Sequence, residues 1–322
     1  MQCLEVWGGN VATNTAFVMP GLDAWIYSKP FADPNIQTEN HTEDAGGDIH
    51  YLSSCATGRI SRLLVADVAG HGKSVAKVTS TLASLLRKHS NQVNMTRFVH
   101  GLNREFVAHS EAGIFATAVA ATYWAPTNQM ILCNAGHPKP LLYRSKTGAW
   151  EFIVGEALAQ PVNAPHQPNN VPLGITDLVS YTATTVNMEP GDLMLLYTDS
   201  MIEARSPFGE FIGQQGLVNL MNTLDPNPTS LIPSLLAKLN EFRGGADDND
   251  DVTAMLLRST SFSQSRVSQT ALAGMTMGRA LVDKLLHPDK PFPRLEMSDG
   301  IKKLKDLGFA RPELLTLRDI TS

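Results

Sequence analysis

The stretch GGDIHYLSSCATGRISRLLVADVAGHG (residues 46–72) decides the fold, because it holds two β-rich runs around a short turn that contains a glycine. This pattern predicts a β-hairpin. Asp48 and Asp67 lie equally far from a turn centred between Thr57 and Gly58. We therefore expect the two carboxylates to face each other across an antiparallel ladder, with roughly 5 Å between their Cβ atoms. Like charges placed there destabilise a sheet unless something neutralises them, and a bridging divalent cation does so.

The glycine-rich turn after Asp67 raises a second interpretation, because Gly72, Lys73 and Ser74 resemble the end of a phosphate-binding P-loop. The P-loop motif G-x-x-x-x-G-K-[ST] requires glycine five positions before Gly72, and this chain has Asp67 there. A carboxylate at that position would repel a phosphate, so the sequence disfavours the P-loop. Two interpretations of Asp67 remain open at this point: it caps the following helix, or it binds a hard cation such as Mg²⁺ or Mn²⁺.

Two further acids have placements that match those of the hairpin. Asp199 directly follows the apolar run LMLLYT, and Asp250 directly precedes the run VTAMLL. If these runs pair antiparallel, one edge can hold all four acids, which is the arrangement of two-metal hydrolases. Each acid also has a plainer interpretation, because Asp199 could simply turn the chain and DDNDD (247–251) could be a solvated loop. The possible convergence of four acids favours the metal site.

Composition limits the class of protein. The chain has 322 residues, of which 43% are hydrophobic and 18% charged, as expected for a globular protein with a substantial core. The net charge of −5 disfavours a nucleic-acid surface, and no run is long enough to span a membrane. The N-terminus lacks the basic start and apolar run of a signal peptide. Three widely spaced cysteines predict a reduced, cytoplasmic protein without a zinc site.

The pattern along the chain predicts an α+β fold, a β-sandwich flanked by helices. Hairpin patterns recur around residues 125–128 and 145–148, and helical periodicity appears at 74–90, 95–109 and 228–242. Residues 153–180 are rich in proline and asparagine and are expected to form a long surface loop.

We divide the chain into three parts. Residues 1–20 are an N-terminal segment, 21–259 the main domain, and 260–322 a polar linker followed by a helical tail. Packing on the core, a helical appendage and partner docking are all open as roles for the tail. Nothing in it suggests chemistry.

Eight motifs occur in order and resemble those of the SpoIIE/RsbU-type serine phosphatases, the bacterial branch of the PP2C-like metal-dependent protein phosphatases. The resemblance covers roughly residues 20 to 258. No single motif is specific, but the ordered series is. The motifs are GGD (46–48), VADVAGHG (65–72), FATAVAATY (115–123), NAGHPKPLLY (134–143), PLGI (172–175), GDLMLLYTDSMIEA (191–204), FG (208–209) and DDVT (250–253).

The resemblance implies an α-β-β-α sandwich of two antiparallel sheets, with two Mn²⁺ or Mg²⁺ ions at one edge. It implies removal of phosphate from phosphoserine or phosphothreonine in a protein. Asp251 is implied to be a neighbour of the site or an optional ligand for a further ion. The implied metal ligands are Asp48, Asp67, the backbone carbonyl of Val68, Asp199 and Asp250.

The chain departs from the family pattern in several places. Ser200 stands where glycine is usual, and residues 49–51 replace the usual F-Y-D. His71 lies four residues beyond Asp67, whereas the proton-donating histidine of eukaryotic relatives lies two beyond, so that role does not transfer to it. Loop packing is the favoured interpretation of His71, and a structural hydrogen-bonding role that of His137.

Three functional hypotheses follow. The first is a metal-dependent phosphoprotein phosphatase, whose substrate could be a STAS-domain anti-sigma-factor antagonist. The others are a non-catalytic PP2C-like module that binds a partner, and a metal hydrolase of a small phosphoester. We expect no sensor domain in the roughly twenty residues before the catalytic region. Regulation is expected from a partner, the tail, or homodimerisation through the helices after Asp67.

Overall fold

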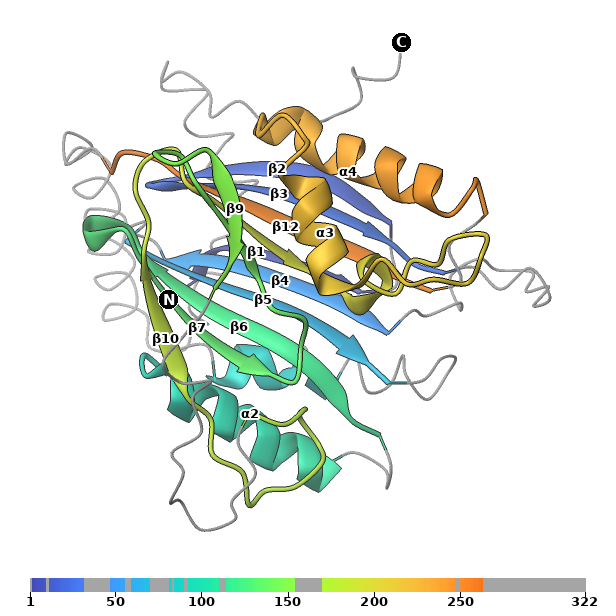
Figure 1. The fold of residues 1–322 in the computed structure, drawn as a ribbon. Helices are drawn as coiled ribbons and strands as arrows, with labels where there is room; N and C mark the ends of the chain where they lie inside the picture. Colours follow the sequence, from blue (N-terminus) through green and yellow to red (C-terminus); the bar gives the residue numbers. More distant parts are fainter. Residues whose placement is uncertain are drawn as a thin grey trace, which may run out of the picture.

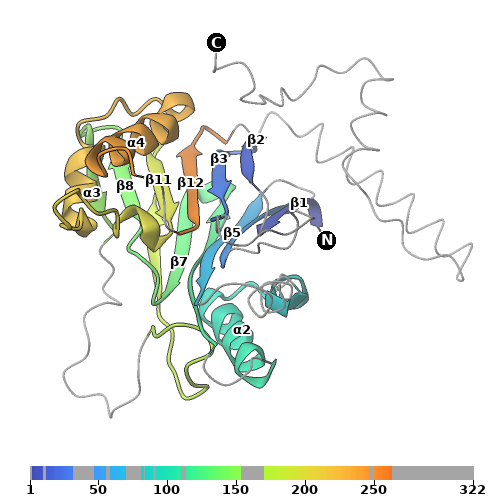
Figure 2. The same cartoon turned by 90° about the vertical axis from the view of Figure 1, so that its right-hand side faces the viewer.

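The computed structural model describes residues 2–9, 12–31, 47–55, 59–69, 81–82, 84–89, 92–109, 114–153, 170–246 and 250–262. In these residues, two six-stranded sheets pack face to face, and helices cover the outer face of each sheet (Figure 1, Figure 2). The layer order is helix, sheet, sheet, helix. The predicted α+β sandwich of two antiparallel sheets is confirmed.

Sheet A contains the hairpin of residues 46–72. β4 pairs with β5 so that Asp48 lies opposite Asp67, which confirms the predicted register. β6 and β7 form a second predicted hairpin, joined by the short helix η1 (Ala125–Thr127). In spatial order, the strands of sheet A are β1 (Gln2–Gly9), β4 (Asp48–Cys55), β5 (Ile60–Val68), β6 (Ala116–Trp124), β7 (Gln129–Ala135) and β10 (Ala183–Asn187).

Sheet B brings together strands from both ends of the described chain. β11 pairs antiparallel with β12, with Tyr197 opposite Ala254, which is the pairing that the hypothesis of one acidic edge required. β8 and β9 form the third predicted hairpin. In spatial order, the strands are β2 (Thr13–Met19), β3 (Leu22–Lys29), β12 (Val252–Ser259), β11 (Leu193–Tyr197), β8 (Leu141–Arg144) and β9 (Ala149–Phe152).

The helices begin at side-chain caps. α2 (Met95–His109) follows Asn94, whose side chain accepts a hydrogen bond of 2.9 Å from the Arg97 amide, and α4 (Pro228–Phe242) is capped in the same way by Asn227. These two helices have the predicted bounds, whereas α3 (Gly213–Met221) was not predicted. Of the helix expected at 74–90, residues 81–82 and 84–89 are described, and they are helical.

Three hydrophobic layers hold the fold together. The middle layer lies between the sheets, and the outer layers lie between sheet A and α2 and between sheet B and the pair α3 and α4. β5 contributes to two of them, because Leu63 and Val65 point between the sheets while Leu64 and Ala66 point towards α2. Alternate side chains of a strand face opposite sides, so a strand buried on both faces reads as an uninterrupted apolar run.

The first two strands are part of the sandwich. β1 pairs with β4 and β2 pairs with β3, so the start of the chain supplies an edge strand to each sheet. Gly8 in β1 lies directly against the imidazole of His50, which occupies the space that a Cβ would take. Residues 2–9 and 13–19 therefore belong structurally with the strands of the main domain. The bounds of the three parts stay a prediction.

Several expectations lie outside the described residues, namely most of the loop at 153–180 and the tail after residue 262. Among the helices that are described, we find none with the length and apolar character needed to cross a membrane.

Candidate metal centre

The first pair of acids lies on neighbouring strands of sheet A. Asp48 begins β4, and only 5% of its surface is exposed. Its Oδ2 accepts a hydrogen bond of 2.9 Å from Oγ1 of Thr198, which directly follows β11 of sheet B. Asp67 lies opposite Asp48 near the end of β5 and is only partly buried. The pair therefore sits where the two sheets meet.

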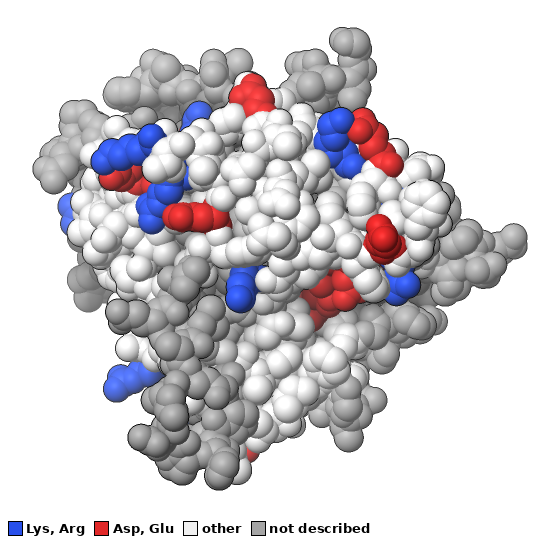
Figure 3. All heavy atoms as spheres, in the orientation of Figure 1, with Lys and Arg blue, Asp and Glu red and all other residues white. Residues whose placement is uncertain are grey.

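The second pair lies just outside the paired strands of sheet B. Asp199 starts the short helix η3 (Asp199–Met201), directly after β11, and Asp250 precedes β12. The ladder extends to Thr198, whose amide donates to the Thr253 carbonyl over 3.1 Å, so β11 and β12 hold the two acids at one edge. Figure 3 shows acidic atoms gathered at the right-hand end of the sandwich, where Figure 1 shows the ends of β4, β5 and β12.

The acids from the two sheets influence one another electrostatically. Burial raises the pKa of Asp67 to about 7, and the charges of Asp199, Asp250, Asp251 and then Glu203 add to the shift. These groups come from two further segments of the chain, so both segments lie within electrostatic range of Asp67.

The other three acids are shifted in the same direction. The pKa of Asp48 is raised well above its ordinary value, first by burial and then by the charge of Asp67. Burial also raises the pKa of Asp199 and of Asp250, and Glu203 adds to the shift of Asp199. Each of these shifts raises the pKa, so the four carboxylates disfavour their charged forms in the absence of a bound cation.

Gly47 leaves open space beside two predicted ligands. A Cβ at this position would collide with the Val68 carbonyl oxygen and would lie 2.9 Å from Oδ1 of Asp67. The Val68 amide in turn donates to the Gly47 carbonyl over 3.1 Å, which fixes the distance between the two segments. The glycine of GGD thus allows close approach of the backbone to the Asp67 carboxylate and the Val68 carbonyl.

Asp251 connects the segment of Gly47 and Asp48 to sheet B. Its Oδ1 accepts a 2.6 Å hydrogen bond from the Phe31 amide, and its Oδ2 accepts from the amides of Gly47 and Asp48. Both carboxylate oxygens therefore bind backbone groups, which favours a positioning role for Asp251. Ligation of a further ion by Asp251 stays a prediction.

The donor set fits Mg²⁺ or Mn²⁺. These cations prefer oxygen ligands, and the edge supplies four carboxylates and a backbone carbonyl. In the described part of the chain, no three His, Cys, Asp or Glu side chains are close enough together to form a ready-made metal site. Carboxylates without a cation between them repel each other, so a closed ligand shell is not expected before an ion binds.

The histidines of the motifs do not join this edge in the described structure. His137 is buried, and its Nδ1 lies 2.9 Å from Oγ1 of Thr117, which pairs with Asp67 in the sheet. Burial lowers the pKa of His137 to about 3, opposed by the Tyr197 backbone. This neutral, hydrogen-bonded histidine fits the structural role favoured from the sequence. His71 lies outside the described residues.

Sequence reasoning missed two groups at the edge, Thr198 and Glu203. Thr198 binds Asp48 and also accepts a 3.0 Å hydrogen bond from the Thr253 amide. The Glu203 amide donates to the Asp199 carbonyl over 2.8 Å, so η3 turns this acid back towards Asp199. The spacing of four residues between Asp199 and Glu203 was the available signal, because it allows one helical turn.

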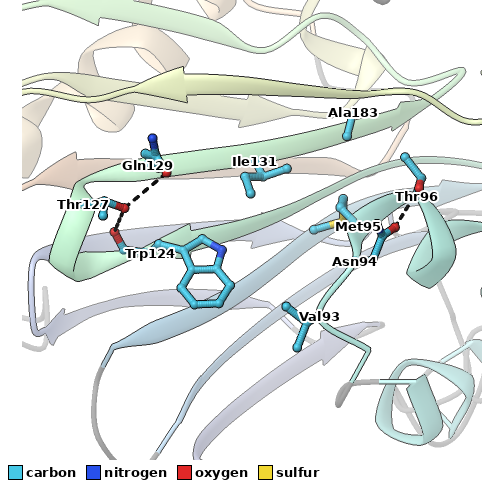
Figure 4. A pocket seen from close by; sticks show the side chains of 9 residues that line it. All are labelled: Val93, Asn94, Met95, Thr96, Trp124, Thr127, Gln129, Ile131 and Ala183. Carbon is cyan, nitrogen blue, oxygen red and sulfur yellow. Dashed lines mark hydrogen bonds between the residues drawn. The ribbon is translucent and has the colours of Figure 1, made fainter.

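A cavity of about 370 Å³ lies on the outer face of sheet A, near the start of α2 (Figure 4). It lies at the Trp124 end of β6, whereas the acids lie at the Ala116 end. No acidic side chain lines it, so it is separate from the candidate metal centre. Its lining residues are Val93, Asn94, Met95, Thr96, Trp124, Thr127, Gln129, Ile131 and Ala183.

Together, two antiparallel sheets between helical layers, with acids from both sheets at one edge, define the PP2C-like class of phosphatase folds. A match to a family profile assigns the chain to one family within this class. The profile described as Stage II sporulation protein E (SpoIIE) matches residues 58–260, more than half of the chain, and the chain belongs to this family.

Individual relatives are distant. The chain is 24% identical over 202 residues to phosphoserine phosphatase RsbU of Bacillus subtilis, covering 61% of this chain and 55% of RsbU. The chain therefore spans about half the length of that relative. A crystal structure of the RsbU and RsbW domains of Rv1364c from Mycobacterium tuberculosis is similar, with a TM-score of 0.58 at 22% identity, covering 79% of this chain and 64% of that one. RsbX in complex with magnesium gives a TM-score of 0.52 at 14% identity, covering 77% of this chain and all of RsbX.

Proposed function

We propose that this chain is a Mg²⁺- or Mn²⁺-dependent protein phosphatase that hydrolyses phosphoserine or phosphothreonine. The observation that carries the proposal is geometric: Asp48 lies opposite Asp67 on paired strands, and Asp199 and Asp250 follow and precede the paired strands β11 and β12. A group of carboxylates that raise one another's pKa is unfavourable by itself and becomes favourable with divalent ions. Membership of the SpoIIE family supports the same activity.

Two ions are expected, held by groups from both sheets. Asp48, Asp67 and the Val68 carbonyl would bind from sheet A, and Asp199 and Asp250 from sheet B. When bound, such ions lower the pKa of a coordinated water and neutralise the charge of the phosphate under attack. Metal-bound RsbX, a structural neighbour, supports a divalent cation as the cofactor.

The chain's own residues hold this arrangement in place. Thr198 donates to Asp48 and thereby orients its carboxylate, and Asp251 holds the backbone of Gly47 and Asp48. Such outer contacts set the geometry of metal ligands. Hydrolysis breaks the bond between phosphorus and the serine oxygen, and yields inorganic phosphate and a free hydroxyl. No described side chain needs to act as a nucleophile.

We infer that the substrate is a phosphorylated protein, with STAS-domain anti-sigma-factor antagonists as the leading candidates. The similarity to RsbU, a phosphoserine phosphatase, supports this substrate class. The same proposal places the protein in the cytoplasm. It also includes control by a partner, or by a second copy of the chain, at the helices after Asp67.

The deciding experiment is dephosphorylation of a panel of phosphorylated STAS-domain proteins from the same cell, with Mn²⁺ and with EDTA. We expect phosphate release with Mn²⁺ and none with EDTA. Release from p-nitrophenyl phosphate alone would favour a hydrolase of small phosphoesters. No release from any substrate with Mn²⁺ would favour a partner-binding module.

A further inference from the structure

The segment at 205–211 forms a closed loop directly after the metal edge. The amides of Ser206 and Gly209 donate to the carbonyls of Glu210 and Ser206, each over 2.8 Å. The Ser206 hydroxyl accepts from the amides of Phe208 and Glu210 at 3.3 and 3.2 Å. Gly209 has a φ of +84°, which side-chain-bearing residues rarely adopt. The loop is therefore a defined turn.

The base of this loop is joined to the turn that carries Asp199. The Ile212 amide donates to the Ala204 carbonyl over 3.0 Å, and the Gly213 amide donates to the Ile202 carbonyl over 2.9 Å. Residues 202–204 follow η3 immediately. In Figure 1 this golden segment extends beyond the strand ends on the right of the molecule. The loop is thus held in place beside the candidate metal centre.

The loop presents aromatic surface to solvent. Phe208 is 92% exposed and Phe211 is 51% exposed, and the Arg205 guanidinium lies 4.2 Å from the centre of the Phe211 ring. Phe208 is the most exposed large hydrophobic residue among those described. Burial of an exposed phenylalanine at an interface is favourable, and aromatic residues with arginine dominate binding hot spots. The hydrogen-bonded turn keeps Phe208 away from the core.

We propose that the 205–211 loop is the docking element for the phosphoprotein substrate, with Phe208 as its anchor. The inference rests on the proposed function. It extends that function, because it assigns substrate selection to a surface outside the metal ligands. Phe208 would bury an apolar side chain of the substrate, and Arg205 would pair with an acidic one.

Charge explains why such a loop is needed. The acids at the edge repel a phosphate until cations neutralise them, so binding energy from remote contacts helps to bring a substrate in. A small phosphoester lacks the apolar and acidic side chains that the loop is proposed to bind. The loop therefore distinguishes a protein substrate from a small one.

Phe208→Ser tests the proposal, with Phe208→Leu as the conservative variant. Leu178→Ser serves as the matched control, since Leu178 is 68% exposed and lies on a different segment. With Mn²⁺, we expect Phe208→Ser to raise KM about tenfold for the phosphorylated STAS-domain protein that is turned over fastest, with kcat unchanged. Activity on p-nitrophenyl phosphate should stay within about twofold, and Phe208→Leu should recover most of the loss. A tenfold change corresponds to about 1.4 kcal/mol.

An unchanged KM for the phosphoprotein, or an equal loss on p-nitrophenyl phosphate, would overturn the docking role. Affinity for the same phosphoprotein, measured by calorimetry in the Asp67→Asn background with and without Phe208→Ser, gives a readout independent of turnover. A tenfold weaker affinity there supports docking even if the chain proves inactive, which separates this inference from the proposed function. No affinity at all, or loss of a dimer in sedimentation with substrate affinity unchanged, would contradict it.

Discussion

The two pairs of acids at the metal edge are held in different ways. Asp48 and Asp67 lie within paired strands, so the hydrogen-bonded ladder sets their separation. Asp199 and Asp250 lie just outside the paired residues of β11 and β12, and Asp199 begins the short helix η3. Asp48 is almost completely buried, whereas Asp250 is exposed.

The difference indicates a division of labour. Asp67 raises the pKa of Asp48, and Asp199 and Asp250 raise that of Asp67, so Asp67 is the acid on which the other charges act. Asp199 and Asp250 lie outside the ladder, so strand pairing does not fix them directly. Loss of an acid from either pair should abolish activity, and loss of Asp67 should relieve the largest repulsion in the metal-free protein.

The largest expected effect on activity comes from removing one acid of each pair in turn. Asp67→Asn and Asp199→Asn should each lower Mn²⁺-dependent hydrolysis of p-nitrophenyl phosphate by more than about 100-fold, since loss of outer contacts alone costs about 10–100-fold. Asp225→Asn, at an exposed acid on a different segment, is the control and should be unaffected. Retention of activity in either of the first two variants would contradict the proposed ligand set.

Asp251 connects the two pairs, and its removal should have the next largest effect. Asp251→Asn keeps the size of the side chain but supplies only one oxygen for amides that both carboxylate oxygens now bind. We expect about a 10- to 100-fold loss of activity at limiting Mn²⁺. Saturating Mn²⁺ should restore part of it, because the residue positions ligands. A loss that Mn²⁺ does not relieve would instead indicate direct ligation or a folding defect, which circular dichroism separates.

The raised pKa of Asp67, caused first by burial and then by the charges of Asp199 and Asp250, should appear as a pH dependence of stability in EDTA. Asp67 keeps its proton up to about pH 7 when folded but releases it near its ordinary value of 3.8 when unfolded. The folded state thus binds more protons between about pH 4 and 7, so the free energy of unfolding falls as pH rises through this window. One proton gives at most about 1.4 kcal/mol per pH unit.

Urea unfolding at several pH values measures this slope. Asp67→Asn should flatten it more than Asp250→Asn, and Mn²⁺ should remove it, because bound cations favour the ionised carboxylates. Equal slopes in both variants would show that the two pairs do not differ in the way described above.

The smallest effect should come from the hydroxyl that joins the pairs. Thr198→Val removes the donor to Asp48 and the acceptor for the Thr253 amide. Half-saturation by Mn²⁺ should rise up to about tenfold, because each lost hydrogen bond is worth about 0.5–1.5 kcal/mol. Thr198→Ser keeps the hydroxyl and should behave like the wild type. If Ser and Val give the same result, the hydroxyl does not orient Asp48.

The sequence was most informative where the contacts are local. The register of Asp48 and Asp67 follows from one short turn, because a hairpin fixes which residues face each other. The hypothesis of one acidic edge assumed antiparallel pairing of two apolar runs, and β11 and β12 pair in this way. That the four acids act together as ligands stays a prediction.

Other features depend on contacts that one segment cannot specify. The pairing of β1 with β4 joins segments about forty residues apart, and no local turn fixes it. The η3 turn that brings Glu203 towards Asp199 depends on packing after β11. Neighbouring Asp250 and Asp251 look alike in the sequence, yet alternate side chains face opposite ways, so one faces the edge and the other binds amides of Gly47 and Asp48.

The central position of β12 has a consequence for synthesis on the ribosome. β12 is the last described strand in the sequence, yet it lies between β3 and β11. Until Ser259 has left the exit tunnel, those two strands have no neighbour between them, and their unpaired backbone is open to wrong partners. The nascent polypeptide therefore needs protection from wrong pairing late in translation. A messenger RNA truncated before the codons of β12 would yield a product that cannot fold correctly.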